Sequence, residues 1–125
     1  MGSNGYKIRV DSMKKIFIKV KNQFIAVHQW ENAPEESILR NPHRHVFHVT
    51  STISVNHKER ELEFFEVQKI IEKSVVVFQG YVHGESCETM ASFLYEVLKS
   101  KCGEDRLVSV EVSEDNENSA IVGDI

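Results

Sequence analysis

The sequence is poor in cysteine and proline, with two of each in 125 residues, and it has no long apolar run. Cys87 and Cys102 show neither a metal-binding spacing nor the number needed for a disulfide framework. No apolar stretch approaches the ~18 residues that a membrane-spanning helix needs, and no signal-peptide pattern opens the chain. These absences argue against a secreted disulfide scaffold and a membrane protein, and we expect a cytoplasmic location.

An excess of positive charge is also lacking: 15 lysines and arginines stand against 19 acidic residues, for a net charge of −4. Without a clustered basic face, the chain is not expected to have nucleic acid as its main partner. Its length suits one domain with a real core. Residues 1–12 are mostly small or polar and Met13 has the look of a natural start. We therefore interpret 1–12 as a leader segment and 13–125 as the single domain.

Two strands are expected in the first half of the chain. Apolar residues at positions 16, 18 and 20 alternate with the residues between them, and this period-2 pattern runs towards His28. Residues 31–42 contain both prolines and are expected to form a loop. Residues 43–55 then form a second β-like run.

Two helices and two further strands are expected after them. Positions 64, 67, 70 and 71 form one apolar stripe of a helix over residues 63–74. Residues 75–78 suit either the end of that helix or a strand. Ser86 is a good N-cap and Gly103 a good C-terminal stop for a second helix. With strands at 107–112 and 120–122, the order predicts an α+β fold: one four-stranded antiparallel sheet with both helices on one face.

Three histidines lie on the two N-terminal strands. His43 and His45 are two residues apart, so on a strand their side chains share a face, roughly 6.5 to 7 Å apart along the backbone. His28, on the neighbouring strand, can supply a third imidazole. Three neutral imidazoles leave one tetrahedral position open, as in catalytic zinc sites. The pattern predicts such a site, although histidines on a strand can also simply pack.

Five segments, in chain order, match the motifs of a single known family. They are residues 24–28 (FIAVH), similar to F-x-A-A-H; 43–47 (HRHVF), similar to H-G-H-N/S-Y/F; 63–68 (EFFEVQ), similar to D-F-x-x-L-K; 88–95 (ETMASFLY), similar to T-x-E-N-x-A-x-x-I-W; and 110–116 (VEVSEDN), similar to V-x-V-x-E-T. The chain thus resembles the 6-pyruvoyl-tetrahydropterin synthase and 6-carboxytetrahydropterin synthase family, zinc enzymes of biopterin and queuosine precursor synthesis. Each motif is loose, and their shared order carries the resemblance.

The resemblance implies a fold, a metal and an assembly. The fold would be T-fold-like, with sheets that close into trimeric barrels stacked as a hexamer, and with active sites between subunits. The zinc ligands would be His28, His43 and His45. The substrate would be a pterin-like small molecule.

The resemblance also implies residues that hold this substrate. Glu114 would grip the guanidine-like edge of the pterin through a bidentate, charge-assisted contact. Ser86 and Cys87 fall where the family has threonines that line the same pocket. Simpler interpretations stay open, because Glu114 could be a solvated turn carboxylate and Ser86 only a helix cap.

The sequence departs from the family at its proton-transfer residues. The family places a catalytic cysteine four residues before the first histidine of the pair, where this chain has Leu39. Its aspartate–histidine pair between the helices is also missing from residues 75–80 (VVVFQG). Arg44 replaces the glycine between the paired histidines.

The candidates for a replacement base are His83, Glu35 and Glu36. Losing a general base typically costs on the order of 10²–10⁴ in rate. Three hypotheses follow: a zinc lyase with an altered proton route, a catalytically silent paralogue that binds a pterin or purine, and a structural protein whose histidines only pack.

Overall fold

Two long strands run side by side through the whole fold. Strand β1 (Ile16–His28) and strand β2 (His43–Val55) pair antiparallel along their full length, from Ile16 opposite Val55 to His28 opposite His43. The computed structural model describes residues 14–125, so the interpretation of residues 1–12 as a leader lies outside the described part. The alternation predicted from the sequence is present, with one face of each strand buried and the other more exposed.

The sheet is larger than the sequence suggested. Strand β4 (Val108–Glu114) pairs antiparallel with β2, and β5 (Asn118–Gly123) pairs antiparallel with β4. A two-residue strand, β3 (Val82–His83), adds to the other side of β1 in parallel. The predicted four-stranded antiparallel sheet is therefore a five-stranded mixed sheet, in the order β3-β1-β2-β4-β5. A strand of two residues is too short to produce an alternating pattern, which is why it escaped prediction.

The helices lie where the sequence places them. Helix α1 (Phe64–Ser74) has Glu63 as its N-cap and runs into a 3-10 helix, η2 (Val75–Phe78), which settles the ambiguous segment as helical. Helix α2 (Cys87–Cys102) begins at its N-cap Ser86 and ends at Gly103. Gly103 has a φ of 134°, a conformation that residues with a Cβ rarely adopt.

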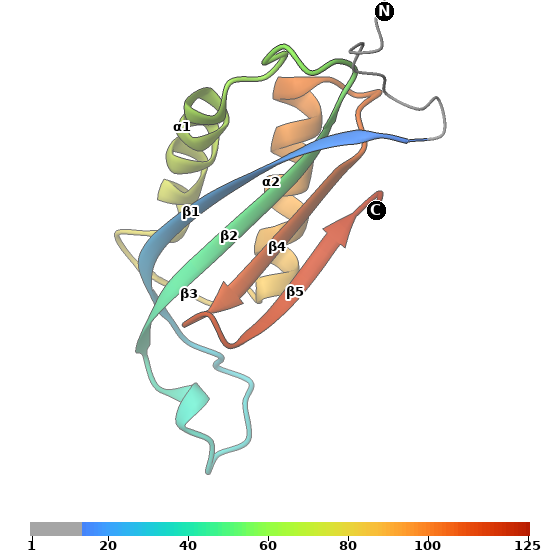
Figure 1. Ribbon diagram of the computed structural model, residues 1–125. Coiled ribbons are helices and arrows are strands. Elements are labelled where there is room, and N and C mark those ends of the chain that lie inside the picture. Colours follow the sequence, from blue (N-terminus) through green and yellow to red (C-terminus); the bar gives the residue numbers. More distant parts are fainter. Residues whose placement is uncertain (1–13) are drawn as a thin grey trace, which may run out of the picture.

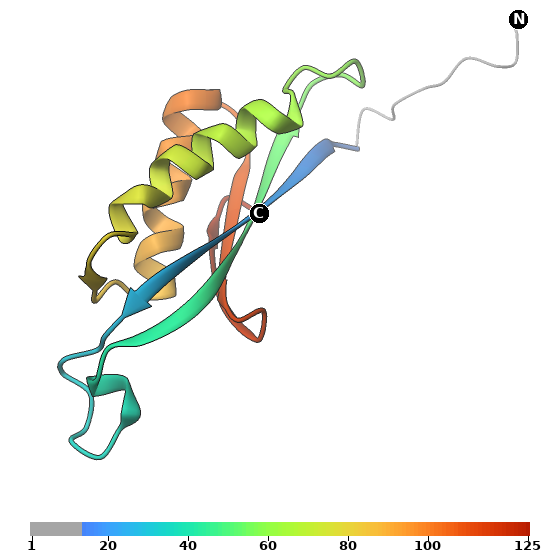
Figure 2. The ribbon, with the colours of Figure 1, turned by 90° about the vertical axis from the view of Figure 1, so that its left-hand side faces the viewer.

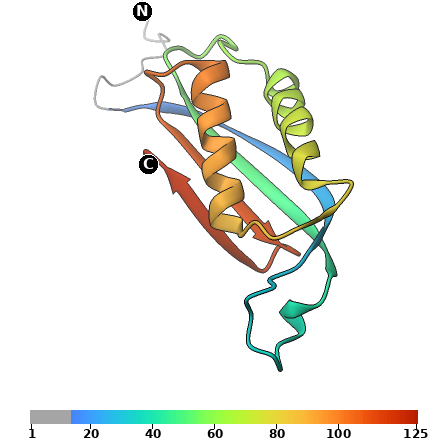
Figure 3. The ribbon, with the colours of Figure 1, turned by 180° about the vertical axis from the view of Figure 1, so that it is seen from behind.

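The core lies between the helices and the sheet. Both helices cover the same face of the curved sheet, and the opposite face is left uncovered (Figures 2 and 3). The aromatic centre of this core is the stacked pair Phe24 and Phe47, whose ring centroids are 5.2 Å apart. Among the described residues, no helix is both long and apolar enough to cross a membrane. The α+β architecture predicted from the sequence is confirmed.

Three parts of the chain converge at one end of the sheet. Residues 29–42, which include a short 3-10 helix η1 (Ile38–Arg40), connect β1 to β2 and project beyond the sheet (Figure 1). The turn between β4 and β5 and the N-terminus of α2 lie towards the same end (Figure 1). The three histidines predicted to bind metal are located there, because they stand at the end of β1 and the start of β2.

Candidate metal centre and adjoining cavity

The three predicted metal ligands come together. His28 pairs directly with His43 across the β1·β2 ladder, and His45 lies two residues further along β2, opposite Ala26. One ligand atom from each imidazole can be chosen so that all three lie within 4.8 Å of one another. His28 is buried, with 8% of its surface exposed, and the other two are partly buried. The strand register alone therefore assembles a cluster that could hold a metal ion.

Hydrogen bonds orient two of the imidazoles. His43 Nδ1 lies 2.7 Å from the Asn41 carbonyl oxygen, and His45 Nδ1 lies 2.7 Å from Asp115 Oδ2. A carbonyl oxygen can only accept a hydrogen bond, and the same is true of the oxygens of an ionised carboxylate. Each Nδ1 therefore carries a proton and donates it. In the neutral imidazole this leaves Nε2 with a free lone pair, the form that binds metal.

The remaining nitrogen atoms support the same assignment. His45 Nε2 is buried and has no hydrogen-bond partner, which is unfavourable unless something outside the chain satisfies it. His43 Nε2 lies at hydrogen-bond distance, 3.2 Å, from His28 Nδ1, which is also close to the ~3.3 Å that separates two nitrogens bound to one tetrahedral zinc ion. Burial, followed by the neighbouring His83 and His43, lowers the pKa of His28. His28 is thus held neutral, as a metal ligand must be, and the donor set fits zinc.

Asp115 is a supporting residue that the sequence analysis did not find. It stands in the β4–β5 turn with φ of 52°, followed by Asn116 at 61°, a conformation that aspartate and asparagine tolerate better than most residues. Its backbone N–H donates to the Val46 carbonyl at 2.7 Å, and its Oδ1 accepts from the Val46 N–H at 3.0 Å. The turn is thereby fastened to β2, and Oδ2 is aimed at His45.

The charge of Asp115 fits this role. The hydrogen bond from His45, followed by that from the Val46 N–H, lowers the pKa of the Asp115 carboxyl. A carboxylate behind a ligating imidazole fixes the tautomer and raises the basicity of the ligand. An Asp-Asn pair at a hairpin turn is a visible sequence signal, but its contact with a histidine 70 positions away depends on the β2·β4 register.

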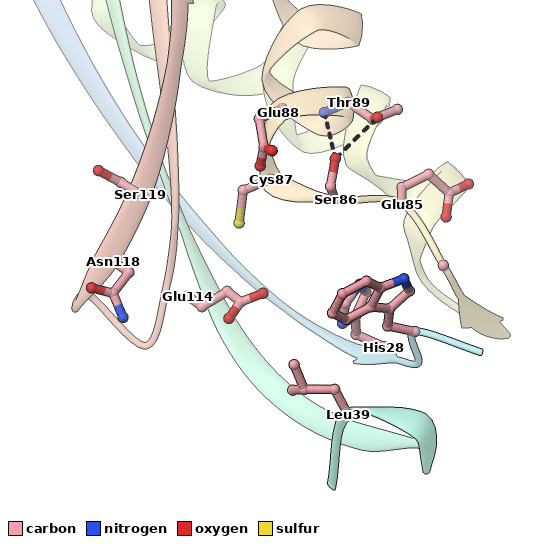
Figure 4. Close-up of a pocket in the computed structure, with 12 residues that line it drawn as sticks. His28, Leu39, Glu85, Ser86, Cys87, Glu88, Thr89, Glu114, Asn118 and Ser119 are labelled. Atoms are coloured by element: carbon pink, nitrogen blue, oxygen red, sulfur yellow. Dashed lines mark hydrogen bonds between the residues drawn. The ribbon is translucent and has the colours of Figure 1, made fainter. Parts of the chain in front are cut away.

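A cavity of about 850 Å³ adjoins the histidine cluster at His28. This volume lies within the range of ordinary small-molecule sites. Its walls come from the end of β1, the loop after it, the start of α2 and the β4–β5 hairpin (Figure 4). The lining residues are His28, Trp30, Leu39, Gly84, Glu85, Ser86, Cys87, Glu88, Thr89, Glu114, Asn118 and Ser119. The three substrate-binding candidates from the sequence, Glu114, Ser86 and Cys87, are all among them.

Glu114 occupies a central position in this cavity. Its carboxylate points into the space between Cys87 and His28 (Figure 4), and its Oε2 lies 3.9 Å from His45 Nε2. Burial, with the carboxylates of Glu114 and Glu88 nearby, raises the pKa of the Cys87 thiol to about 12. Cys87 is therefore a neutral thiol at physiological pH, and a poor nucleophile.

Ser86 already has a structural partner. Its Oγ accepts a hydrogen bond from the Thr89 N–H at 3.1 Å and donates to Thr89 Oγ1 at 3.1 Å. The hydroxyl thus caps α2 while lining the cavity. Its contact with a ligand stays a prediction, as do those of Glu114 and Cys87.

The candidate bases are placed very differently. His83 is buried beside His28, its partner in the β1·β3 pairing, with ring centroids 5.1 Å apart. Its Nδ1 lies 3.1 Å from Glu85 Oε2, while its Nε2 is buried without a partner. Glu35 and Glu36 are exposed in the loop after β1 and do not line the cavity.

The two positions that depart from the family pattern are also visible. Leu39 lines the cavity, so an alkyl side chain stands where the family pattern has its cysteine. Arg44 lies between the paired histidines and is exposed, since alternation along β2 turns it to the other face. The extra cation therefore does not enter the cluster of imidazoles.

Comparison with known proteins identifies the fold. No family model matches the chain, and no curated protein matches it. The structure of 6-pyruvoyl tetrahydropterin synthase from Caenorhabditis elegans superposes with a TM-score of 0.70 at 13% identity, over 93% of this chain and 100% of that chain. An uncharacterized protein from Wolinella succinogenes superposes with a TM-score of 0.67 at 13% identity, over 90% and 99%. The chain has the fold that its five ordered motifs predicted.

The Asp115–His45 contact generates a prediction. If the cluster binds a metal ion, replacing Asp115 by alanine should weaken that binding by roughly 10- to 100-fold, because His45 loses the partner that fixes its tautomer. Competition titration with a chromophoric chelator measures this affinity. Glu117→Ala, an exposed change in the same turn, is the matched control. Equal affinities of the two variants would show that Asp115 does not support the site.

Proposed function

We propose that the protein is a zinc-dependent, lyase-type enzyme that acts on a dihydroneopterin-like substrate, in the manner of the synthases whose fold it has. The observation that carries this proposal is the position of three imidazoles, with lone pairs available to a metal, beside a cavity that contains Glu114. A cytoplasmic location is part of the proposal.

Different residues of the site would bind the metal and the substrate. His28, His43 and His45 would hold zinc, which when bound supplies Lewis acidity and a water of lowered pKa. Glu114 would accept two N–H groups from the guanidine-like edge of a pterin, fixing the ring in one orientation. The volume of the cavity suits a ligand of this size.

The proton route must differ from that of the family. Leu39 has no group that can accept a proton, and Cys87 is held as a thiol. None of the three candidate bases lines the cavity; His83 is favoured because its ring lies against His28, which does line it, and its Nδ1 is bonded to Glu85. Glu35 and Glu36 are secondary candidates, since they would reach a substrate only after a rearrangement of their loop.

The alternative is a catalytically silent, zinc-containing paralogue that binds a pterin or purine. Leu39 in the cavity wall favours it, because this substitution removes a reactive group without removing any residue that would hold metal or ligand. Metal content distinguishes the enzyme and the silent paralogue, which both bind zinc, from a structural protein whose histidines only pack. Turnover distinguishes the enzyme from the silent paralogue.

Metal analysis is the first test. We expect one zinc per chain in the purified protein, because the cluster provides three nitrogen ligands. His43→Ala should abolish stoichiometric zinc, measured by plasma mass spectrometry against protein concentration. His48→Ala, on the same strand but outside the cluster, should retain it. Full metal content in the His43 variant would place the site elsewhere.

Turnover is the second test. With 7,8-dihydroneopterin triphosphate or its unphosphorylated form, we expect zinc-loaded protein to be on the order of 10²–10⁴ slower than an ordinary synthase, because the family's base is absent. Steady-state kinetics with product mass as readout measures this rate. His83→Ala should remove the residual activity, and Glu35→Gln should not. A rate equal to that of ordinary synthases would show that the base has been misplaced.

Assembly is the third test. Among the described residues, no strand pairs with the edge of β1 before Val27 or with the outer edge of β5, and such edges favour pairing with another chain. On β1, the carbonyls of Lys21 and Ile25 accept hydrogen bonds from the side chains of Gln68 and Gln79, so β5 is the more open edge. Phe17 and Ile121 are exposed on these two strands. We propose that copies join edge to edge into a hexamer. Sedimentation should give about six times the 14.4 kDa of one chain; a mass near 14.4 kDa would contradict it.

A further inference from the structure

One wall of the cavity is apolar and half exposed. It is formed by Trp30, the only tryptophan of the chain, and Leu39. Trp30 keeps 48% of its surface exposed although it borders a cavity. Neither residue contacts metal or acts on a proton in the proposed chemistry. A large aromatic side chain left open in this position offers a flat face to a ligand.

Hydrogen bonds hold this wall in place. The backbone N–H of Trp30 donates to the Leu39 carbonyl at 2.8 Å, which joins the two sides of the loop. Gln29 braces the same loop: its Nε2 donates to the Arg40 carbonyl at 2.6 Å, and its backbone N–H donates to the His83 carbonyl at 2.9 Å. A surface that is already ordered loses little entropy when a ligand binds.

The polar part of the cavity carries one sign of charge. Glu85, Glu88 and Glu114 all line it, and Figure 4 shows Glu114 and Glu88 on the side of Cys87, with Leu39 below them. Carboxylates grouped around a cavity attract N–H donors and repel phosphate groups, because like charges in a partly enclosed space are weakly screened. The three carboxylates also outweigh the two positive charges of the zinc ion proposed at His28, so the cavity stays net negative with metal bound.

We propose that Trp30 is the stacking face of this cavity, and that the site selects a planar, unphosphorylated heterocycle whose edge carries several N–H groups. The inference rests on the proposed pterin pocket and narrows it to substrates without a phosphate chain. The ring would lie on the indole and Leu39, with its N–H edge towards Glu114. The carboxylates of Glu85 and Glu88 would disfavour the triphosphate form of the same ring.

Calorimetric titration of the purified full chain tests the proposal with two probes, 7,8-dihydroneopterin and its triphosphate. The unphosphorylated probe should bind more tightly, and the difference should shrink as salt is raised. Trp30→Ala should weaken binding roughly tenfold, as the loss of a stacking partner does, while Trp30→Phe should keep most of the affinity. Glu88→Gln should narrow the difference between the two probes.

Ile38→Ala is the matched control, because Ile38 lies in the same loop, is 81% exposed and does not line the cavity; its affinity should equal that of the wild type. Unchanged binding by Trp30→Ala, or tighter binding of the triphosphate, would overturn the inference. If Glu114→Gln loses the ligand but Trp30→Ala keeps it, the proposed pterin pocket is supported and only the role of Trp30 as a stacking face is contradicted. If the wild type binds neither probe, the inference falls, while zinc content decides separately whether the metal site remains.

Discussion

The antiparallel register between β1 and β2 is the constraint on which the rest of the site depends. It places His28 opposite His43 and Phe24 opposite Phe47, so one ladder of backbone hydrogen bonds sets both the histidine cluster and the aromatic centre of the core. A slip of one residue would turn every side chain of a strand to the other face. Such a slip would expose the buried apolar side chains of β1, so the packing of the core protects the geometry of the imidazoles.

The remaining elements pack around the paired strands β1 and β2 and add residues to the site. The short strand β3 sets His83 against His28, and the β4–β5 hairpin brings Glu114 and Asp115 to the same end of the sheet. Helix α2 contributes its first turn to the cavity and its buried face to the core. The histidine cluster, the cavity and the fold are therefore supported by overlapping sets of contacts.

The sequence predicted the features that arise from local periodicity. The two long strands and both helices can be recognised in the chain from a repeating apolar pattern or a capping residue. The histidine cluster can be recognised from the two-residue spacing of His43 and His45 and from His28 on the neighbouring strand. Asp115 and Trp30 escaped prediction because their roles depend on which strands become neighbours and on how a loop folds back. Strand β3 escaped because it is held by its pairing with β1 rather than by any pattern of its own.

Glu114 and Asp115 are adjacent in the chain but serve different tasks. One faces the cavity, and the other holds His45. Because a single turn carries both, a ligand that drew the hairpin towards itself would also change the hydrogen bond between Asp115 and His45, a proposed metal ligand. By thermodynamic reciprocity, a metal that tightens that bond must change the affinity for the ligand by the same factor. The hairpin thus places a residue of the cavity next to a residue that supports the proposed metal site, which makes it the element through which the two binding equilibria would be coupled.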